Sequence, residues 1–385
     1  MKKIILALLF ISIFLSCKND ENANKITLGD FTFSSKTITQ NESFHITYHG
    51  EGKLEDSFYH QMKNSQVFPV DLLFQNNTAT ITIPDSISAV AFNFKIDGSY
   101  ENNNKQGFLF TVRDKSGDML TVSDAALKYY AMSYGEQYEV EGDPKAALQA
   151  IEAALKSDPS LVKDWRQLHL YTANQVDATK GKKVGEMYIT EITSKENMDL
   201  EDYKALSRMY SSMRNKVKSD SIVDIVIKKY PDSDLAFRPI IDKFFSIRDL
   251  KSKEALFSSH KEKFLSSNYA DFIVSNLAMQ HRSAGNKKKF DEYLTLVEDN
   301  MEKASLFNSI AWSNAEKGTD LEASSELSMQ SLQLIAEEQK LLKNKPTYYS
   351  LNQYKNSLES NYNMFADTYA LLAFKRGDIK DAVKY

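Results

Sequence analysis

The chain of 385 residues contains a single cysteine, Cys17. One thiol forms no internal disulfide, no CxxC redox pair and no cysteine-rich metal site, so these three kinds of chemistry are excluded. Glycine and proline are also scarce, at 13 and 7 residues. Because these two residues punctuate turns and loops, their scarcity favours long helical stretches over an all-β chain.

The chain also lacks a basic excess and long apolar runs. It has 48 basic and 52 acidic residues, a net charge of -4, so nucleic acid is not expected as a partner. After the N-terminal run from Ile4 to Leu15, no apolar stretch approaches the ~20 residues of a membrane-spanning helix. The length and the 42% of hydrophobic residues predict a chain of two domains.

The N-terminus follows the pattern of a lipoprotein signal. Lys2 and Lys3 precede the apolar run, which is too short to span a bilayer. The following Leu15-Ser16-Cys17 resembles the bacterial lipobox, whose cysteine is acylated and becomes the new N-terminus. An ordinary secretory signal with an incidental cysteine is the alternative. We predict that residues 1–17 are a signal peptide and that the acylated Cys17 attaches the protein to the lipid bilayer.

Residues 18–25 are polar and are predicted to form a flexible tether. Lys18 stands where aspartate would retain a lipoprotein in the inner membrane, and acidic residues follow it. This segment is similar to the surface-export signal of Bacteroidetes lipoproteins. We therefore expect an outer-membrane lipoprotein of the cell envelope, on the periplasmic face or on the cell surface.

Short β-type runs succeed one another over residues 26–120. Thr78 to Ile83 and Val90 to Ile96 alternate apolar and polar side chains, as a strand half-buried against a second sheet requires. The other predicted strands cover residues 26–33, 43–48, 67–74 and 107–112. Six or seven strands within residues 26–120 predict a small immunoglobulin-like β-sandwich.

Past Leu120 the apolar period lengthens, and the spacing matches the tetratricopeptide repeat (TPR). The matching positions are Gly135, Tyr138, Ala147, Ile151, Ala154 and Pro159. In this register the small residues let two helices approach, the larger ones fill the gap between them, and the proline ends the hairpin. Residues 121–385 are therefore predicted to form an all-α TPR-like solenoid of about seven or eight hairpins. The whole chain is then an α+β multidomain protein.

Weaker copies of the repeat follow the first one. The glycine at Gly142 recurs at Gly285, Gly318 and Gly377, each followed five residues later by an apolar residue. The last copy is incomplete, since the sequence reaches Tyr385 before the positions equivalent to Ile151 and Ala154. This pattern predicts that the natural protein continues or that the chain is a fragment.

The sequence shows no recognisable catalytic, cofactor-binding or metal-binding pattern. G-x-S-x-G, P-loop and G-x-G-x-x-G motifs are missing. His45 and His49 in one strand would lie about 13 Å apart, too far to bind one ion. Trp165 and Trp312 are predicted to lie in the core. The tyrosines Tyr348, Tyr349 and Tyr354 either line a partner groove or pack between helices.

Three segments carry a resemblance to a known family. They are Asp97 to Phe108, Asn308 to Gly318 and Phe365 to Ala370. The chain resembles the non-catalytic front part of TlpA-like thiol-disulfide reductase lipoproteins of Bacteroidetes, in which a lipobox, a β-sandwich and helical repeats precede a thioredoxin-like domain. No CxxC and no thioredoxin domain occur in this sequence, so the family's catalytic residues have no counterpart here.

These observations leave three functional hypotheses. The first is a membrane-anchored, non-enzymatic lipoprotein without a cofactor, whose TPR solenoid binds an unidentified protein or peptide. The second is an accessory region of a periplasmic thiol-disulfide oxidoreductase whose thioredoxin-like domain lies beyond Tyr385. The third is a glycan-binding lipoprotein similar to the SusD group, which would present exposed tryptophan platforms.

Overall fold

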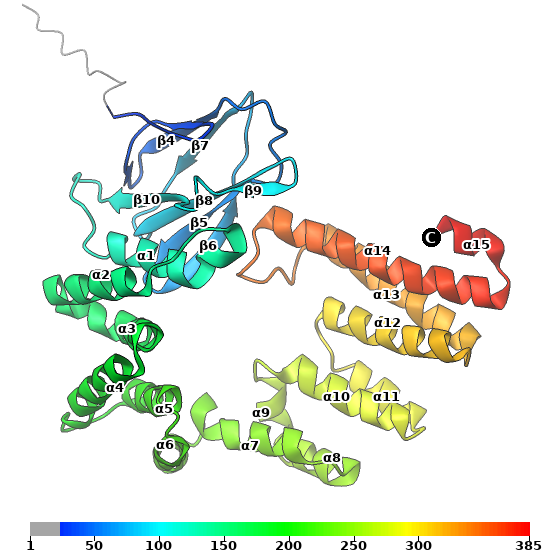
Figure 1. Ribbon diagram of the computed structural model, residues 1–385. Coiled ribbons are helices and arrows are strands. Elements are labelled where there is room, and N and C mark those ends of the chain that lie inside the picture. The colour runs from blue at the N-terminus through cyan, green and yellow to red at the C-terminus, as the bar shows by residue number, and fades with distance from the viewer. Residues whose placement is uncertain (1–23) are drawn as a thin grey trace, which may run out of the picture.

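The computed structural model describes residues 24–385. The predicted signal peptide, the lipidated Cys17 and most of the predicted tether lie outside the described residues. A β-rich region comes first, and helices follow it (Figure 1). The last strand ends at Arg113 and the first helix begins at Ser123. The predicted α+β class is thereby confirmed.

The β-rich region, called the strand region below, consists of two sheets around one apolar core. The first sheet has the strand order β1-β2-β4-β7, and the second has β3-β10-β8-β5-β6 with β9 paired to β8. Phe31 and Phe33 from the first sheet and Phe92, Phe94 and Phe110 from the second share this core. The strands are β1 Ile26–Leu28, β2 Phe31–Phe33, β3 Ile38–Thr39, β4 Ser43–Tyr48, β5 Phe58–Lys63, β6 Gln66–Asp71, β7 Thr78–Thr82, β8 Ala89–Ile96, β9 Ser99–Glu101 and β10 Phe108–Arg113.

Strands β8 and β5 differ from the prediction because the second sheet is covered on both faces. In addition, the predicted run 26–33 is divided into β1 and β2, and the short strands β3 and β9 were not predicted. We expected β8 to be half-buried, but its first six residues are all buried. Val90 and Phe92 face the other sheet, whereas Ala89 and Ala91 pack with helix α1. Strand β5 was not predicted at all. Both of its faces are covered as well, so its sequence shows no clean alternation for a period of two to detect.

The helices continue in chain order, and sequence neighbours such as α1 and α2, α3 and α4, and α12 and α13 pack together. Their bounds are α1 Ser123–Tyr134, η1 Gly135–Tyr138, α2 Pro144–Ser157, η2 Pro159–Leu161, α3 Val162–Val176, α4 Ala178–Thr193, α5 Leu200–Ser212, α6 Lys216–Lys229, α7 Asp234–Ser246, α8 Leu250–Ser259, α9 Lys261–Leu265, α10 Ala270–Ser283, α11 Lys287–Leu294, α12 Asn300–Lys317, α13 Leu321–Leu341, α14 Leu351–Arg376 and α15 Ile379–Lys384. None of the helices in residues 24–385 is long and apolar enough to cross a membrane.

The repeated glycines have two different physical reasons. Gly285, Gly318 and Gly377 have positive φ angles of 74°, 68° and 83° and follow the ends of α10, α12 and α14. A glycine at the end of a helix adopts this left-handed conformation without steric cost. Gly142 instead lies against α1, and a Cβ atom there would come within 2.3 Å of the Met132 Cα. A side chain is therefore excluded at Gly142 by close backbone approach.

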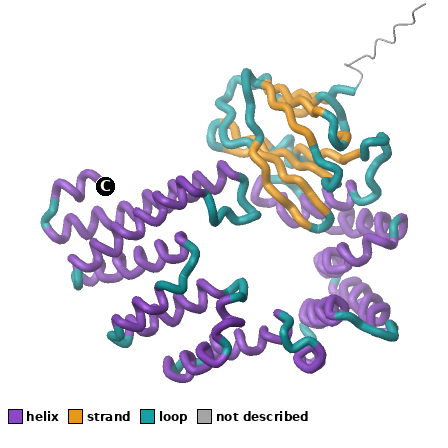
Figure 2. Tube along the Cα trace, turned by 180° about the vertical axis from the view of Figure 1, so that it is seen from behind, coloured by secondary structure: helices purple, strands orange, loops and turns teal. Residues whose placement is uncertain are grey.

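The helices form an arc that leaves the strand region at α1 and returns to it at α14, so the chain approximates a ring (Figures 1 and 2). Where the arc returns, both carboxylate oxygens of Asp71 accept the backbone N–H of Asn352, at 3.2 and 3.0 Å. The Asn356 side-chain amide donates to Asp56 Oδ2 at 2.8 Å. We call this contact between the start of α14 and the strand region the junction.

The two tryptophans have different environments. Trp165 on α3 is 2% exposed, so the prediction that it lies in the core is confirmed. Trp312 on α12 is 44% exposed, so the same prediction for this residue is wrong. Ala311 and Ala315 hold the buried positions on that part of α12. Trp312 thus falls on the outer side of a helix whose buried stripe consists of smaller residues.

Candidate functional site

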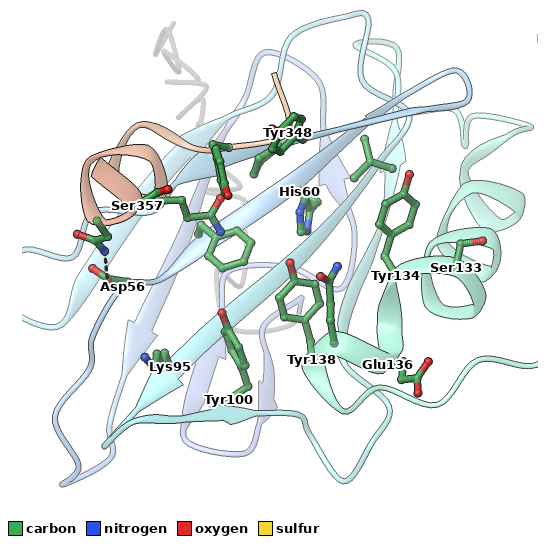
Figure 3. A pocket seen from close by; sticks show the side chains of 17 residues that line it. Asp56, His60, Lys95, Tyr100, Ser133, Tyr134, Glu136, Tyr138, Tyr348 and Ser357 are labelled. Atoms are coloured by element: carbon green, nitrogen blue, oxygen red, sulfur yellow. Dashed lines mark hydrogen bonds between the residues drawn. The ribbon is translucent and has the colours of Figure 1, made fainter. Parts of the chain in front are cut away.

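The junction encloses a pocket of about 950 Å³, which we call the junction pocket. Three parts of the chain line it: strands β5, β6, β8 and β9, the end of α1 with η1, and the start of α14 with the loop before it. Figure 3 shows His60, Tyr100, Tyr134 and Tyr138 on one side and Tyr348 facing them from the chain that leads into α14. The pocket therefore exists only when the arc returns to the strand region.

Tyr138 is the centre of the wall on the strand side. Its ring centroid lies 5.7 Å from that of Phe58, 5.6 Å from that of His60 and 5.1 Å from that of Tyr100. The TPR register predicted that Tyr138 fills a gap between two helices. In the structure α1 ends at Tyr134, the chain turns in η1, and the ring of Tyr138 packs on the sheet instead.

Behind this wall lies a buried polar group of three side chains. The Tyr130 hydroxyl is 2.8 Å from His60 Nδ1 and donates to Asn93 Oδ1 at 3.3 Å, while Asn93 Nδ2 is 3.1 Å from His60 Nδ1. Burial lowers the pKa of His60 to about 4 and raises the pKa of Tyr130 well above its usual range. Both side chains are therefore uncharged at neutral pH, and they fix α1 to the sheet.

The wall on the helix side comes from the loop before α14. The ring centroids of Tyr348 and Tyr349 lie 4.8 Å apart, and the Tyr348 side chain is 69% exposed. Ser350 and Gln353 form a capping box that begins α14 directly after these tyrosines. Tyr354, in contrast, is buried among helices and donates its hydroxyl to Glu338 at 3.0 Å. Tyr348 and Tyr349 thus line the pocket, whereas Tyr354 belongs to the helix packing.

Five tyrosines line the junction pocket: Tyr100, Tyr134, Tyr138, Tyr348 and Tyr349. Across residues 24–385, none of their hydroxyls has a hydrogen-bond partner. Burial raises the pKa of Tyr138, and burial together with the nearby Asp56 carboxylate raises the pKa of Tyr100. The hydroxyls of Tyr100 and Tyr138 therefore keep their protons at neutral pH, and a tyrosine hydroxyl is a hydrogen-bond donor.

Three charged side chains line the pocket, Asp56, Glu136 and Lys95, and their net charge is -1. Asp56 is occupied by its hydrogen bond from Asn356, and Lys95 Nζ lies 4.0 Å from a carboxylate oxygen of Glu55. Glu136 is exposed at the edge. The pocket therefore offers aromatic rings and uncharged donors, a composition suited to binding.

The other positions of the first TPR copy lie in or next to α2. Ala147, Ile151 and Ala154 are on its buried face, at 0%, 0% and 4% exposure, and Pro159 begins the short turn η2. Gly135 follows α1, and a Cβ atom there would meet the Val140 carbonyl oxygen at 2.6 Å. The glycine that lets α2 approach α1 is Gly142 instead. Of the six positions, only Tyr138 lines the pocket.

Among residues 24–385, no group of three or more His, Cys, Asp or Glu side chains is placed to hold a metal ion. His45 and His49 each contact a threonine of a neighbouring strand. His45 Nδ1 is 2.9 Å from Thr80 Oγ1, and His49 Nε2 is 3.0 Å from Thr32 Oγ1.

Comparisons with known proteins give little. No protein-family model matches the chain, and no curated protein matches it significantly. One solved structure, described as "Crystal structure of BtubC (BKLC) from P. vanneervenii", aligns with a TM-score of 0.24 and 10% sequence identity. The alignment covers 63% of this chain and 84% of that chain. A similarity this low carries no argument about fold or function.

Proposed function

We propose that this protein is a membrane-anchored, non-enzymatic lipoprotein of the cell envelope that binds a protein or peptide partner. In this proposal Cys17 carries the lipid anchor, the strand region is an immunoglobulin-like sandwich, and the helices are TPR-like repeats. The resemblance to the front part of TlpA-like lipoproteins fits the same arrangement.

The junction pocket is the observation that carries the proposal. Its rings and hydroxyls come from segments more than 200 residues apart in the sequence, such as Tyr100 and Tyr348. Tyrosine is enriched at protein interfaces because its ring gives apolar contact and its hydroxyl gives hydrogen bonds at low cost in side-chain entropy. A concave site of this composition supports binding of a partner.

A site-specific crosslinking experiment tests the proposal. Photoreactive benzoylphenylalanine replaces Tyr348 in the full chain, and the protein is expressed in a bacterium that has an outer membrane. We expect one or a few discrete protein adducts after irradiation. The matched control carries the same residue at Val217 on α6, which is 77% exposed and far from the pocket. Equal labelling at both positions, or none at position 348, would count against the proposal.

A further inference from the structure

Neighbouring rings of the junction pocket meet edge to face or tilted, and they do not form one flat platform. Tyr100 and Tyr138 meet at 89°, and Tyr348 and Tyr349 meet at 52°. No extended flat surface therefore spans two of these rings, and no tryptophan of residues 24–385 lines the pocket. Angled tyrosines leave slots between their rings, and in known recognition modes such aromatic slots accept proline rings of an extended chain.

The hydrogen-bonding groups of the pocket point to the same kind of ligand. Its five free tyrosine hydroxyls are donors that need acceptors, and a polyproline II segment presents backbone carbonyls that have no internal partners. Proline has no backbone N–H, so burying it leaves no donor unsatisfied. Asp56 and Lys95 already have partners and Glu136 is exposed at the edge, so the ligand needs no charged group to pair with them.

The junction itself is small and polar. Its hydrogen bonds among residues 24–385 run from the Asn352 amide to Asp71 and from the Asn356 side chain to Asp56. Within the part of the chain that the structure describes, no apolar cluster combines side chains of α14 with side chains of the strand region. Contacts of this size allow the two walls to separate. A ligand that touches both walls would hold them together.

We propose that the junction pocket binds an uncharged, extended, proline-containing polypeptide segment between the strand region and α14, so that binding and closure of the ring are coupled. This inference rests on the proposed function and names its ligand. The ligand binds the closed ring better than the open one, which is the condition for coupling.

The first experiment measures binding to the full chain in detergent, with a fluorescent decaproline peptide as the probe and a Gly-Ser peptide of equal length as the comparison. We expect saturable binding of decaproline only. Tyr348→Ala should weaken binding about tenfold, because an exposed ring of the wall is lost. Tyr138→Phe should weaken it about threefold by removing one donor, whereas Tyr269→Ala on the distant, 53% exposed Tyr269 should change nothing.

The second experiment measures closure without any ligand. The Asn352 amide is one of the N-terminal amides of α14 that have no partner inside the helix, so its protection from hydrogen exchange reports the junction. Asp71→Ala should raise its exchange rate, while the Gln353 amide, bonded to Ser350, should stay protected. Decaproline should slow exchange at Asn352 in the natural chain.

The outcomes separate the two proposals. If crosslinking at Tyr348 captures a protein but decaproline fails to bind, or if an oligosaccharide displaces the bound probe, the ligand class named here is wrong while the binding function stands. If decaproline binds without slowing exchange at Asn352, the coupling is wrong. If neither a crosslinked partner nor a peptide is found, the proposed function itself fails.

Discussion

The strand region and the helical arc are stabilised in different ways. The strand region has one apolar core, in which Phe94 stacks on Phe31 at 3.7 Å and meets Phe108 edge to face at 4.9 Å. The arc instead has several smaller clusters, each shared by neighbouring helices. A single core couples all its strands, whereas a series of clusters couples only neighbours. The two regions should therefore respond differently to similar damage.

The largest effect is expected in the strand region. Phe94→Ala removes a fully buried ring between the sheets and should lower the free energy of unfolding by about 4 kcal/mol. Hydrogen exchange should rise in all strands of both sheets together. Denaturant unfolding followed by circular dichroism measures the loss, and Leu73→Ala, at a 68% exposed position, is the control without effect.

A similar deletion in the arc should act locally. Leu277 on α10 is fully buried in the cluster that α7 to α12 share. Leu277→Ala should cost about 3 kcal/mol, and exchange should rise in α7 to α12 while the strand amides keep their protection. If hydrogen exchange rose equally in the strands, the apolar clusters of the arc would not be independent of the core of the strand region.

The contact between the two regions should depend on pH. The pKa of His60 is about 4 in the folded chain and 6.5 when exposed. Between these values the unfolded state binds more protons than the folded state. The contribution of neutral His60 to the free energy of unfolding is therefore fully present above pH 6.5 and is lost as the pH falls towards 4. The loss should approach about 3 kcal/mol. Unfolding measured between pH 7 and 4 tests this, and a His60→Gln variant should lose most of that pH dependence.

The smallest expected difference in stability is between two glycine substitutions, one between α1 and α2 and one at the end of α12. Gly142→Ala places a methyl group against the backbone of Met132 and should cost about 2 kcal/mol, because α1 and α2 must separate. Gly318→Ala has open space around the new Cβ and carries only the left-handed backbone strain, about 1 kcal/mol. Thermal unfolding compares them, and equal losses would mean that close approach adds nothing at Gly142.

Sequence patterns predicted the elements whose environment is one-sided. Alternation predicted β7, and a short β-type run predicted β4; each of these strands has one buried face. The longer apolar period after Leu120 predicted helices, and α1 begins at Ser123. The patterns failed for β5, which is covered on both faces. They also failed for Trp312, because a bulky apolar residue in a helix-forming stretch looks like core. Local patterns carry no information on which face a neighbour will cover.

The site was beyond prediction for a related reason. Tyr348 and Tyr349 were recognised as an aromatic group, with a groove and helix packing both left open. Nothing in their surroundings indicated that Tyr138 and Tyr100 would face them, because contacts across the junction depend on the summed curvature of the whole arc. One signal was present in the sequence: Tyr348 and Tyr349 stand directly before the Ser350 and Gln353 capping box, and thus outside the helix that follows.

The ring has a consequence for the entropy of the chain. Asp71 and Asn352 are 281 residues apart, and bringing together the ends of a flexible loop of that length costs about 5 kcal/mol beyond a constant. A hydrogen bond to a charged group contributes about 1.5–3 kcal/mol. The two such interactions of the junction, at Asp71 and at Asp56, together only match the entropic cost of closing the loop. The folded arc must therefore hold α14 near the sheet in advance. If a helix anywhere in the arc unfolds locally, the chain regains some of that entropy and the junction weakens. The stability of the junction therefore depends on helices that do not contact it.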